Sequence, residues 1–121
     1  MAKILQVPTY KDDRGALTVI DKSLPFEVKR VFYIYDVSSK RGGHGHIQSK
    51  IALVAINGSV DIFVQTPSKN EVYKLTKPDE VLILEPEDWH EMDHFSKGAV
   101  LLVLCSHHYD KADYFFEPYR K

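Results

Sequence analysis

Residues 51–65 read IALVAINGSVDIFVQ, and this stretch decides the fold class. Two apolar runs flank an Asn-Gly pair that tolerates the positive φ of a tight turn, so the stretch predicts two strands joined as a hairpin. In the second run every second residue is Val or Ile, which is the pattern of a strand with one buried face. The residues expected on that face are Val60, Ile62 and Val64.

Similar apolar runs of strand length, rich in Val, Ile, Tyr and Phe, recur along the rest of the chain. No segment has the pattern of an amphipathic helix, so we expect many short strands in a barrel or sandwich. Turns containing proline are expected at 66–70, 77–79 and 85–88. The other runs expected to form strands are KILQVP (3–8), ALTVID (16–21), VKRVFYIYDV (28–37), EVYKL (71–75), VLILE (81–85) and AVLLVLCS (99–106).

The composition predicts one globular domain over residues 1–121, since 44% of the residues are hydrophobic and 27% are charged. The formal net charge of −1 offers no general attraction to nucleic acid or to an anionic membrane, and neither is expected as a partner. No run approaches the roughly 20 apolar residues of a membrane span, so we expect a cytoplasmic protein. Cys105, the one cysteine, lies in an apolar run and is expected to be a buried thiol.

Histidines gather in two segments that are far apart in the sequence. The first, RGGHGH (41–46), places His44 and His46 two residues apart, so on an extended strand both imidazoles share one face, about 7 Å apart. Its glycines would let a ligand or another backbone approach closely. The second segment, EPEDWHEMDHF (85–95), adds His90 after a proline turn. We expect the two segments to meet inside one barrel, where imidazole serves either as an acid or base or as a metal ligand.

These two segments resemble the two motifs of the cupins: Gly-Gly-His-Gly-His followed by Gly58, and the stretch from Pro86 to His90. The resemblance implies an all-β, single-domain cupin β-barrel of the RmlC-like jelly-roll type. Metal-binding cupins add a glutamate four or five residues beyond the second histidine, where this chain has Lys50 and Ile51. We therefore expect no metal and no other cofactor, although the three histidines remain a possible three-nitrogen site.

A more specific resemblance covers nearly the whole chain. RGGHGH, the Trp-His-Glu-Met segment that begins at Trp89 and the Tyr-Asp-x-x-Asp-Tyr tail (109–114) are similar to the dTDP-4-keto-6-deoxyhexose 3,4-ketoisomerases, the FdtA/QdtA-like, WxcM-like C-terminal family. The chain departs from that family at Ile47 and Ile51, where lysine and glutamine are common. The resemblance implies that a dTDP-linked 4-keto-6-deoxy sugar is converted to its 3-keto isomer through an enediol. We expect the galacto product rather than the gluco product, as in the biosynthesis of the 3-amino-3,6-dideoxy sugars of surface glycans.

The resemblance also implies roles for the residues that would carry out the reaction. His46 is assigned as the principal base and His44 as its partner, which orients the sugar or relays the proton, because the pKa of histidine lies near working pH. Tyr35, or less favourably Tyr33, is the candidate donor to the enolate oxygen that develops in the transition state. Ordinary packing remains an equal alternative for both tyrosines.

Substrate binding is assigned to Tyr33 and to five further residues. Arg14, Arg30 and Arg41 are candidates for the diphosphate, because guanidinium groups fit phosphate oxygens; exposed ion-paired arginines are the alternative. Trp89 would stack on a ring of the substrate or pack in the core. His90 would touch the sugar and, together with Arg14, help to select the product.

Two other functional classes remain open, a metal-dependent cupin enzyme and a noncatalytic nucleotide-sugar-binding cupin. Loss of activity on chelation would indicate the first, and a binder would not need paired histidines. The alternation of KILQVP and the exposed edges of a small barrel predict a homodimer with exchanged or paired edge strands.

Overall fold

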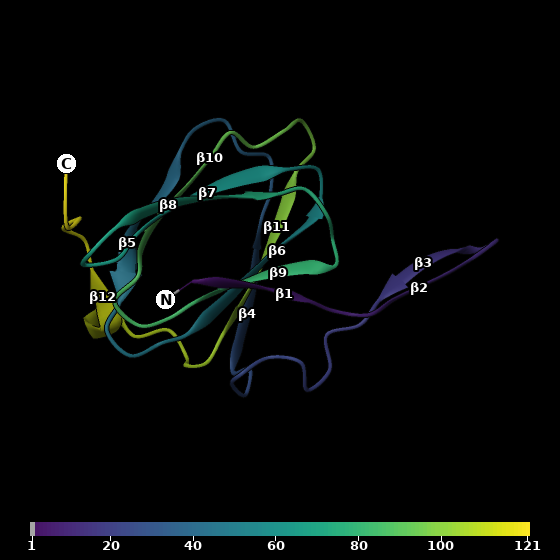
Figure 1. Cartoon of the computed structure of the whole chain (residues 1–121), viewed down its shortest axis with the longest axis horizontal. Helices are drawn as coiled ribbons and strands as arrows, with labels where there is room; N and C mark the ends of the chain where they lie inside the picture. Colours follow the sequence, from purple (N-terminus) through teal and green to yellow (C-terminus); the bar gives the residue numbers. More distant parts are fainter. Residues whose placement is uncertain (1) are drawn as a thin grey trace.

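The computed structural model describes residues 2–121, and the chain folds into two facing antiparallel sheets with a small hairpin beside them (Figure 1). One sheet has the strand order β1-β9-β6-β11-β4 and the other β12-β5-β10-β7-β8, while β2 and β3 pair only with each other. The strands are β1 (Lys3–Gln6), β2 (Thr9–Asp12), β3 (Gly15–Thr18), β4 (Arg30–Ile34), β5 (Arg41–His46), β6 (Ile51–Asn57), β7 (Val60–Gln65), β8 (Asn70–Leu75), β9 (Glu80–Leu84), β10 (Trp89–Asp93), β11 (Val100–Cys105) and β12 (Tyr114–Phe115). A single 3₁₀ turn, η1 (Lys111–Asp113), precedes β12.

The core lies between the two five-stranded sheets. Val60, Ile62 and Val64 point into it and are at most 1% exposed, which confirms the alternation predicted for β7. Leu53 of β6 and Leu101 of β11 are fully buried in the same cluster from the opposite sheet. Removing one such side chain from water contributes about 1.5–3 kcal/mol to folding. Alternating strand residues from both sheets therefore fill the barrel interior, and the fold is the predicted all-β type.

A second apolar layer covers the outer face of the sheet that contains β6. Ala52 and Val54 point to this face and pack near Ile83, and they are covered by Leu24 and Phe26 of the segment between β3 and β4. Both faces of β6 are thus buried, which is why its sequence is continuously apolar whereas that of β7 alternates.

The prediction that the strands on either side of Asn57-Gly58 form a hairpin is wrong. β6 pairs with β9 and β11, whereas β7 pairs with β10 and β8, so the chain crosses from one sheet to the other at this turn. Gly58 does adopt a positive φ of 71°. A Cβ there would lie 2.4 Å from the hydroxyl oxygen of Ser96, so the turn has no room for another residue type. Turn residues specify a reversal of direction, but the pairing partner is set by how the two buried faces pack.

All the apolar runs that were predicted as strands contain a strand, and some of these strands are shorter than predicted. β3 ends at Thr18 and β4 spans only 30–34 within the predicted 28–37. Four strands, β2, β5, β10 and β12, are absent from the predicted set. Polar residues or glycines interrupt the apolar pattern of the first three, and β12 has only two residues. Among residues 2–121, no helix is long and apolar enough to cross a bilayer.

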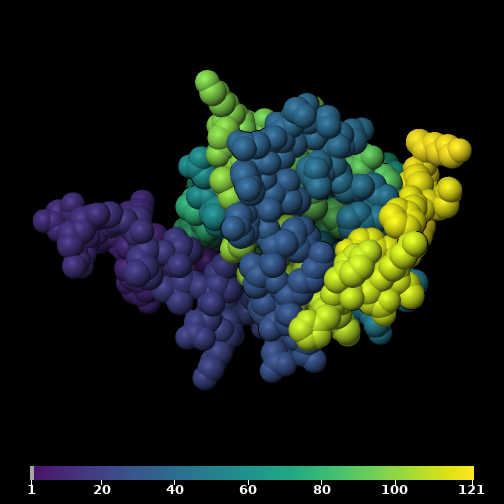
Figure 2. Space-filling model, turned by 180° about the vertical axis from the view of Figure 1, so that it is seen from behind, coloured from purple at the N-terminus to yellow at the C-terminus, as the bar shows by residue number. Residues whose placement is uncertain are grey.

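Two segments lie outside the barrel. The β2–β3 hairpin projects away from it at the purple end of the chain (Figure 1). From behind, the C-terminal segment, in yellow, lies along the barrel wall beside the blue stretch that includes β4 and β5 (Figure 2). The C-terminal contact is specific, because Tyr114 pairs with His46 and Phe115 with Gly45.

Candidate active site

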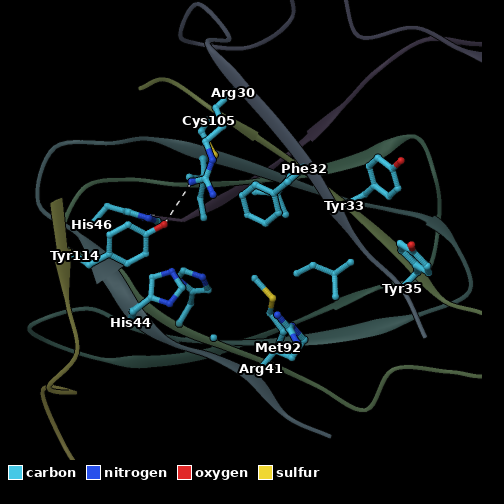
Figure 3. A pocket seen from close by; sticks show the side chains of 15 residues that line it. Arg30, Phe32, Tyr33, Tyr35, Arg41, His44, His46, Met92, Cys105 and Tyr114 are labelled. Carbon is cyan, nitrogen blue, oxygen red and sulfur yellow. Dashed lines mark hydrogen bonds between the residues drawn. The ribbon is translucent and has the colours of Figure 1, made fainter. Parts of the chain in front are cut away.

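A cavity of about 490 Å³ opens in the barrel between β4, β5, β10 and β11 (Figure 3). Its volume is in the range of sites that hold small molecules. The floor is apolar and includes Phe32, Met92 and Val103. The polar side chains that line it include those of Arg30, Arg41, His44, His46, His90 and Tyr114, together with Tyr33 and Tyr35.

The two histidine segments meet in this cavity, as predicted. β5 and β10 are neighbours, and His44 is the register partner of His90. The ring centroid of His44 lies 5.1 Å from that of His46 and 4.7 Å from that of His90, and in both pairs the rings meet edge to face. A Cβ on Gly42 would lie 3.1 Å from the carbonyl oxygen of His90, so this glycine lets β10 approach. The glycines of this segment were predicted to leave room for a ligand or another backbone, and at Gly42 that room is occupied by the backbone of β10.

The C-terminal segment closes the side of the site next to β5. The ring of Tyr114 lies 4.8 Å from that of His44 and 4.7 Å from that of His46. A Cβ on Gly45 would lie 2.4 Å from the ring of Phe115, so the glycine leaves the space into which this ring packs. The roles predicted from sequence did not include Tyr114, although the tail that carries it was part of the resemblance.

Burial keeps the imidazoles in their neutral form. Desolvation, followed by the positive potential of a protonated His44, lowers the pKa of His46 to about 4. The same two causes, together with His46, lower the pKa of His90 to about 3. The pKa of His44 is also lowered, first by desolvation, against a backbone hydrogen bond that raises it. At neutral pH all three rings are therefore unprotonated and able to accept a proton.

His90 has the most enclosed of these rings, with 1% of the residue exposed. Both of its ring nitrogens are buried, and neither has a hydrogen-bond partner within normal geometry. A buried polar atom without a partner costs folding free energy unless a water or a bound molecule supplies one.

The structure brings two of the three candidate arginines to the cavity. Arg30 donates to the hydroxyl of Tyr114 at 3.3 Å, and its guanidinium lies over the ring of Phe32. Arg41 lines the cavity at the start of β5. Arg14 lies outside the cavity of its own chain, on the projecting hairpin, where it is ion-paired with Asp12 and has a side chain that is 87% exposed.

The tyrosines divide between the two ends of the cavity. Tyr33 and Tyr35 stack on each other with their ring centroids 5.9 Å apart, and both are more than half exposed. Figure 3 shows them at the end opposite His44 and His46. Tyr33 and Tyr35 face together, as alternate residues of a strand do, but the structure does not bring Tyr35 to the histidines. The tyrosine that contacts them is Tyr114.

Trp89 is a packing residue, which corrects its predicted place among the substrate contacts. Its side chain is buried and does not line the cavity. The indole N–H donates to the backbone carbonyl of Phe116 at 3.0 Å and so holds the C-terminal segment against the barrel. Cys105 is buried as expected and forms part of the cavity floor.

No three histidine, cysteine or carboxylate side chains within residues 2–121 are arranged to hold a metal ion together. The rings of His46 and His90 are tilted and their centroids lie 6.3 Å apart.

Two facing antiparallel sheets with paired histidines inside define the chain as a barrel of the cupin class. Residues 1–120 match the family model FdtA: WxcM-like, C-terminal, and the chain belongs to this family.

Its relatives are sugar isomerases. The TDP-4-oxo-6-deoxy-alpha-D-glucose-3,4-oxoisomerase of Aneurinibacillus thermoaerophilus is 36% identical, over 93% of this chain and 84% of its own. The structure of QdtA, a sugar 3,4-ketoisomerase from Thermoanaerobacterium thermosaccharolyticum in complex with TDP, matches with a TM-score of 0.93 and 36% identity, over 96% of this chain and 88% of its own. The WlaRB TDP-quinovose 3,4-ketoisomerase of Campylobacter jejuni matches with a TM-score of 0.91 and 39% identity, over 96% and 92%.

Proposed function

We propose that this chain is a 3,4-ketoisomerase that acts on dTDP-4-keto-6-deoxyglucose. The observation that carries the proposal is the pair of neutral imidazoles of the half-buried His44 and the buried His46 in the wall of a cavity large enough for a sugar nucleotide. Family membership and relatives that are named for this reaction support it.

The reaction moves a carbonyl group by one carbon. His46, as a base, removes the proton from C3, and the electrons of that bond form a C3=C4 double bond while the C4 carbonyl becomes an enolate oxygen. The enolate oxygen on C4 takes up a proton, which gives the enediol. The O3 hydroxyl then loses its proton and becomes the new carbonyl, and C4 receives a proton. C3 is thereby oxidised and C4 is reduced, so no external oxidant or reductant is needed.

The other cavity residues have supporting roles in this proposal. His44 relays the proton or orients the sugar. Tyr114 replaces Tyr35 as the donor to the enolate oxygen, because it contacts both histidines and already accepts a hydrogen bond from Arg30. Arg30 and Arg41 hold the diphosphate.

The remaining cavity residues are assigned to the far part of the substrate and to the product. Tyr33 and Tyr35 contact the part of the substrate that lies farther from the reacting carbons. His90 lies beside His44, where an imidazole with free ring nitrogens would help to set the face on which C4 is protonated. We retain the galacto product and supply of 3-amino-3,6-dideoxy sugars as part of the proposal.

Incubation with dTDP-4-keto-6-deoxyglucose in deuterium oxide tests the reaction. We expect ¹³C NMR to show the carbonyl at C3 and ¹H NMR to show deuterium at C4, with coupling constants at C4 that report the gluco or galacto configuration. A parallel sample treated with a chelator should turn over at the same rate, because the usual cupin glutamate is replaced by Lys50 and Ile51. An unchanged spectrum would contradict the proposed activity, and loss of turnover on chelation would favour a metal-dependent enzyme.

We also propose that the enzyme is a cytoplasmic homodimer. Within residues 2–121 the β2–β3 hairpin pairs with no other strand, and Tyr10 and Leu17 lie opposite each other on it, 64% and 59% exposed. An isolated two-stranded hairpin is marginally stable in water, so a second copy that covers these side chains would stabilise it. Such pairing would also carry Arg14, at the tip, toward the other subunit.

Sedimentation equilibrium should give twice the mass of the chain. Leu17→Asp is expected to weaken the dimer by at least about tenfold, because it places a charge in the covered apolar patch. Val72→Asp, on the exposed face of β8, is the matched control. A wild-type protein that sediments as a monomer would contradict the proposal.

A further inference from the structure

The segment after the histidine strand is held by one buried carboxylate. Asp113 is 5% exposed and belongs to the 3₁₀ turn that leads into β12. Its carboxylate accepts the backbone N–H of Gln48 at 2.7 Å and the hydroxyl of Ser49. Its own carbonyl accepts the N–H of Ile47, also at 2.7 Å. Three consecutive residues that directly follow His46 are therefore bound to Asp113.

The same carboxylate shares a small cavity with the His46 ring. Asp113, Ser49 and His46 line this cavity, whose volume of about 10 Å³ has room for no more than about one water molecule. Asp113 is itself 5% exposed, and burial strengthens the interaction of a carboxylate with a positive charge that forms at the same cavity. Consistent with this position, Asp113 opposes the lowering of the pKa of His46 that burial causes, and His46 in turn lowers the pKa of Asp113.

The other groups around His46 offer no comparable negative charge. Other titratable or charged side chains also line one of the two cavities with His46. They are Arg41 and His44 on β5, His90 on β10, Arg30 and Tyr33 on β4, Tyr35 just after β4, Cys105 on β11, and His107, His108, Tyr109, Asp110 and Tyr114 on the C-terminal stretch. Arg30, His44 and His90 would each oppose a positive charge on His46. Asp110 is exposed, and its carboxylate accepts the N–H of Ala112. Asp113 is thus the one buried carboxylate within residues 2–121 that lines either cavity next to His46.

We infer that Asp113 is a positioning residue for the base: it fixes the backbone that follows His46 and stabilises the imidazolium that forms when this histidine takes the C3 proton. The inference rests on the proposed 3,4-ketoisomerase function. It adds a residue from the C-terminal tail to the machinery, and it explains why a carboxylate is kept buried behind a cavity that must bind an anionic nucleotide. A carboxylate in the cavity itself would repel the diphosphate, whereas one behind the ring acts only on His46.

The test compares Asp113→Asn with Ser49→Ala. Asparagine keeps an acceptor for Gln48 and a hydrogen bond to Ser49 but removes the charge, whereas Ser49→Ala removes a hydrogen bond and keeps the charge. With Asp113→Asn we expect the protonated fraction of His46 at pH 4.5, measured by ¹⁵N NMR of the imidazole, to fall about tenfold, equivalent to one pH unit. At pH 7.5 kcat should also fall about tenfold with KM unchanged. Ser49→Ala should stay within about twofold of wild type in both measurements.

The outcomes separate the alternatives. If Asp113→Asn leaves the protonation of His46 unchanged, or if Ser49→Ala changes it equally, the carboxylate has only a structural role and the inference is overturned. If circular dichroism shows that Asp113→Asn does not fold, the reciprocal measurement is made on His46→Gln, in which the pKa of Asp113 should rise; no rise would overturn the inference. The NMR measurement requires no turnover, so failure of the proposed function would appear separately, as a wild-type protein that does not convert the sugar.

Discussion

Replacing His46 with asparagine is expected to lower kcat about 10³-fold, with the affinity for TDP within about twofold of wild type. Loss of a positioned general base costs about 10²–10⁴-fold in rate. His46 is the assigned base, and its pKa of about 4 leaves it unprotonated at neutral pH. Asparagine has a similar reach but cannot accept the C3 proton. Single-turnover kinetics and isothermal titration with TDP would measure the two effects separately.

The wild-type pH profile belongs to the same prediction. Because the pKa of His46 is about 4, protonation of this base should not reduce kcat/KM between pH 8 and 6. His108→Asn is a suitable control, since this histidine is exposed and lies outside the main cavity. Substantial turnover by His46→Asn would contradict the base assignment, and a larger loss in His44→Asn would transfer the role to His44.

Acidification from pH 6 to 4.5 should destabilise the protein steeply, by about 3 kcal/mol per pH unit. His46 and His90 have pKa values of about 4 and 3 in the folded protein, both below the usual value of 6.5. In this interval the unfolded chain binds more protons than the native state, so the free energy of unfolding falls as the pH falls. Each such histidine contributes up to about 1.4 kcal/mol per pH unit. Urea unfolding at several pH values would measure the slope.

The His90→Gln variant measures how much of this pH dependence of the free energy of unfolding comes from the His90 imidazole. His90→Gln should reduce the slope by about 1.4 kcal/mol per pH unit. His108→Gln, an exposed control, should leave it unchanged. A free energy of unfolding that is independent of pH over this interval would show that the imidazoles are not held neutral by burial.

The strands of the apolar core could be predicted from the sequence because the pattern of apolar residues alone specifies them. The alternation in β7 predicted its buried face, since side chains on a strand point to opposite sides. The strands β5 and β10 were harder to identify, because glycines and polar residues replace the apolar pattern where they line a cavity. The histidines within them were nevertheless found, since their spacing and their glycine neighbours carried the signal.

The parts of the site that come from distant segments could not be predicted from the sequence in this way. Tyr114 and Asp113 lie in a tail with no apolar pattern, and only the pairing of β12 with β5 brings them to His46. Arg14 and Arg30 looked alike as candidate phosphate ligands. The fold separates them, because Arg30 enters the barrel on β4 whereas Arg14 projects on an isolated hairpin.

The sequence by itself determined that the chain is all-β, which residues of β7 face the core and which two segments supply the candidate histidines, because period-two burial and residue type are local properties. Only the tertiary structure decided that β6 and β7 lie in different sheets, that Tyr114 rather than Tyr35 contacts the histidines, and that Asp113 lies behind His46. Those outcomes depend on which buried faces pack together. A strand pattern shows that a face is buried, but not which other strand covers it.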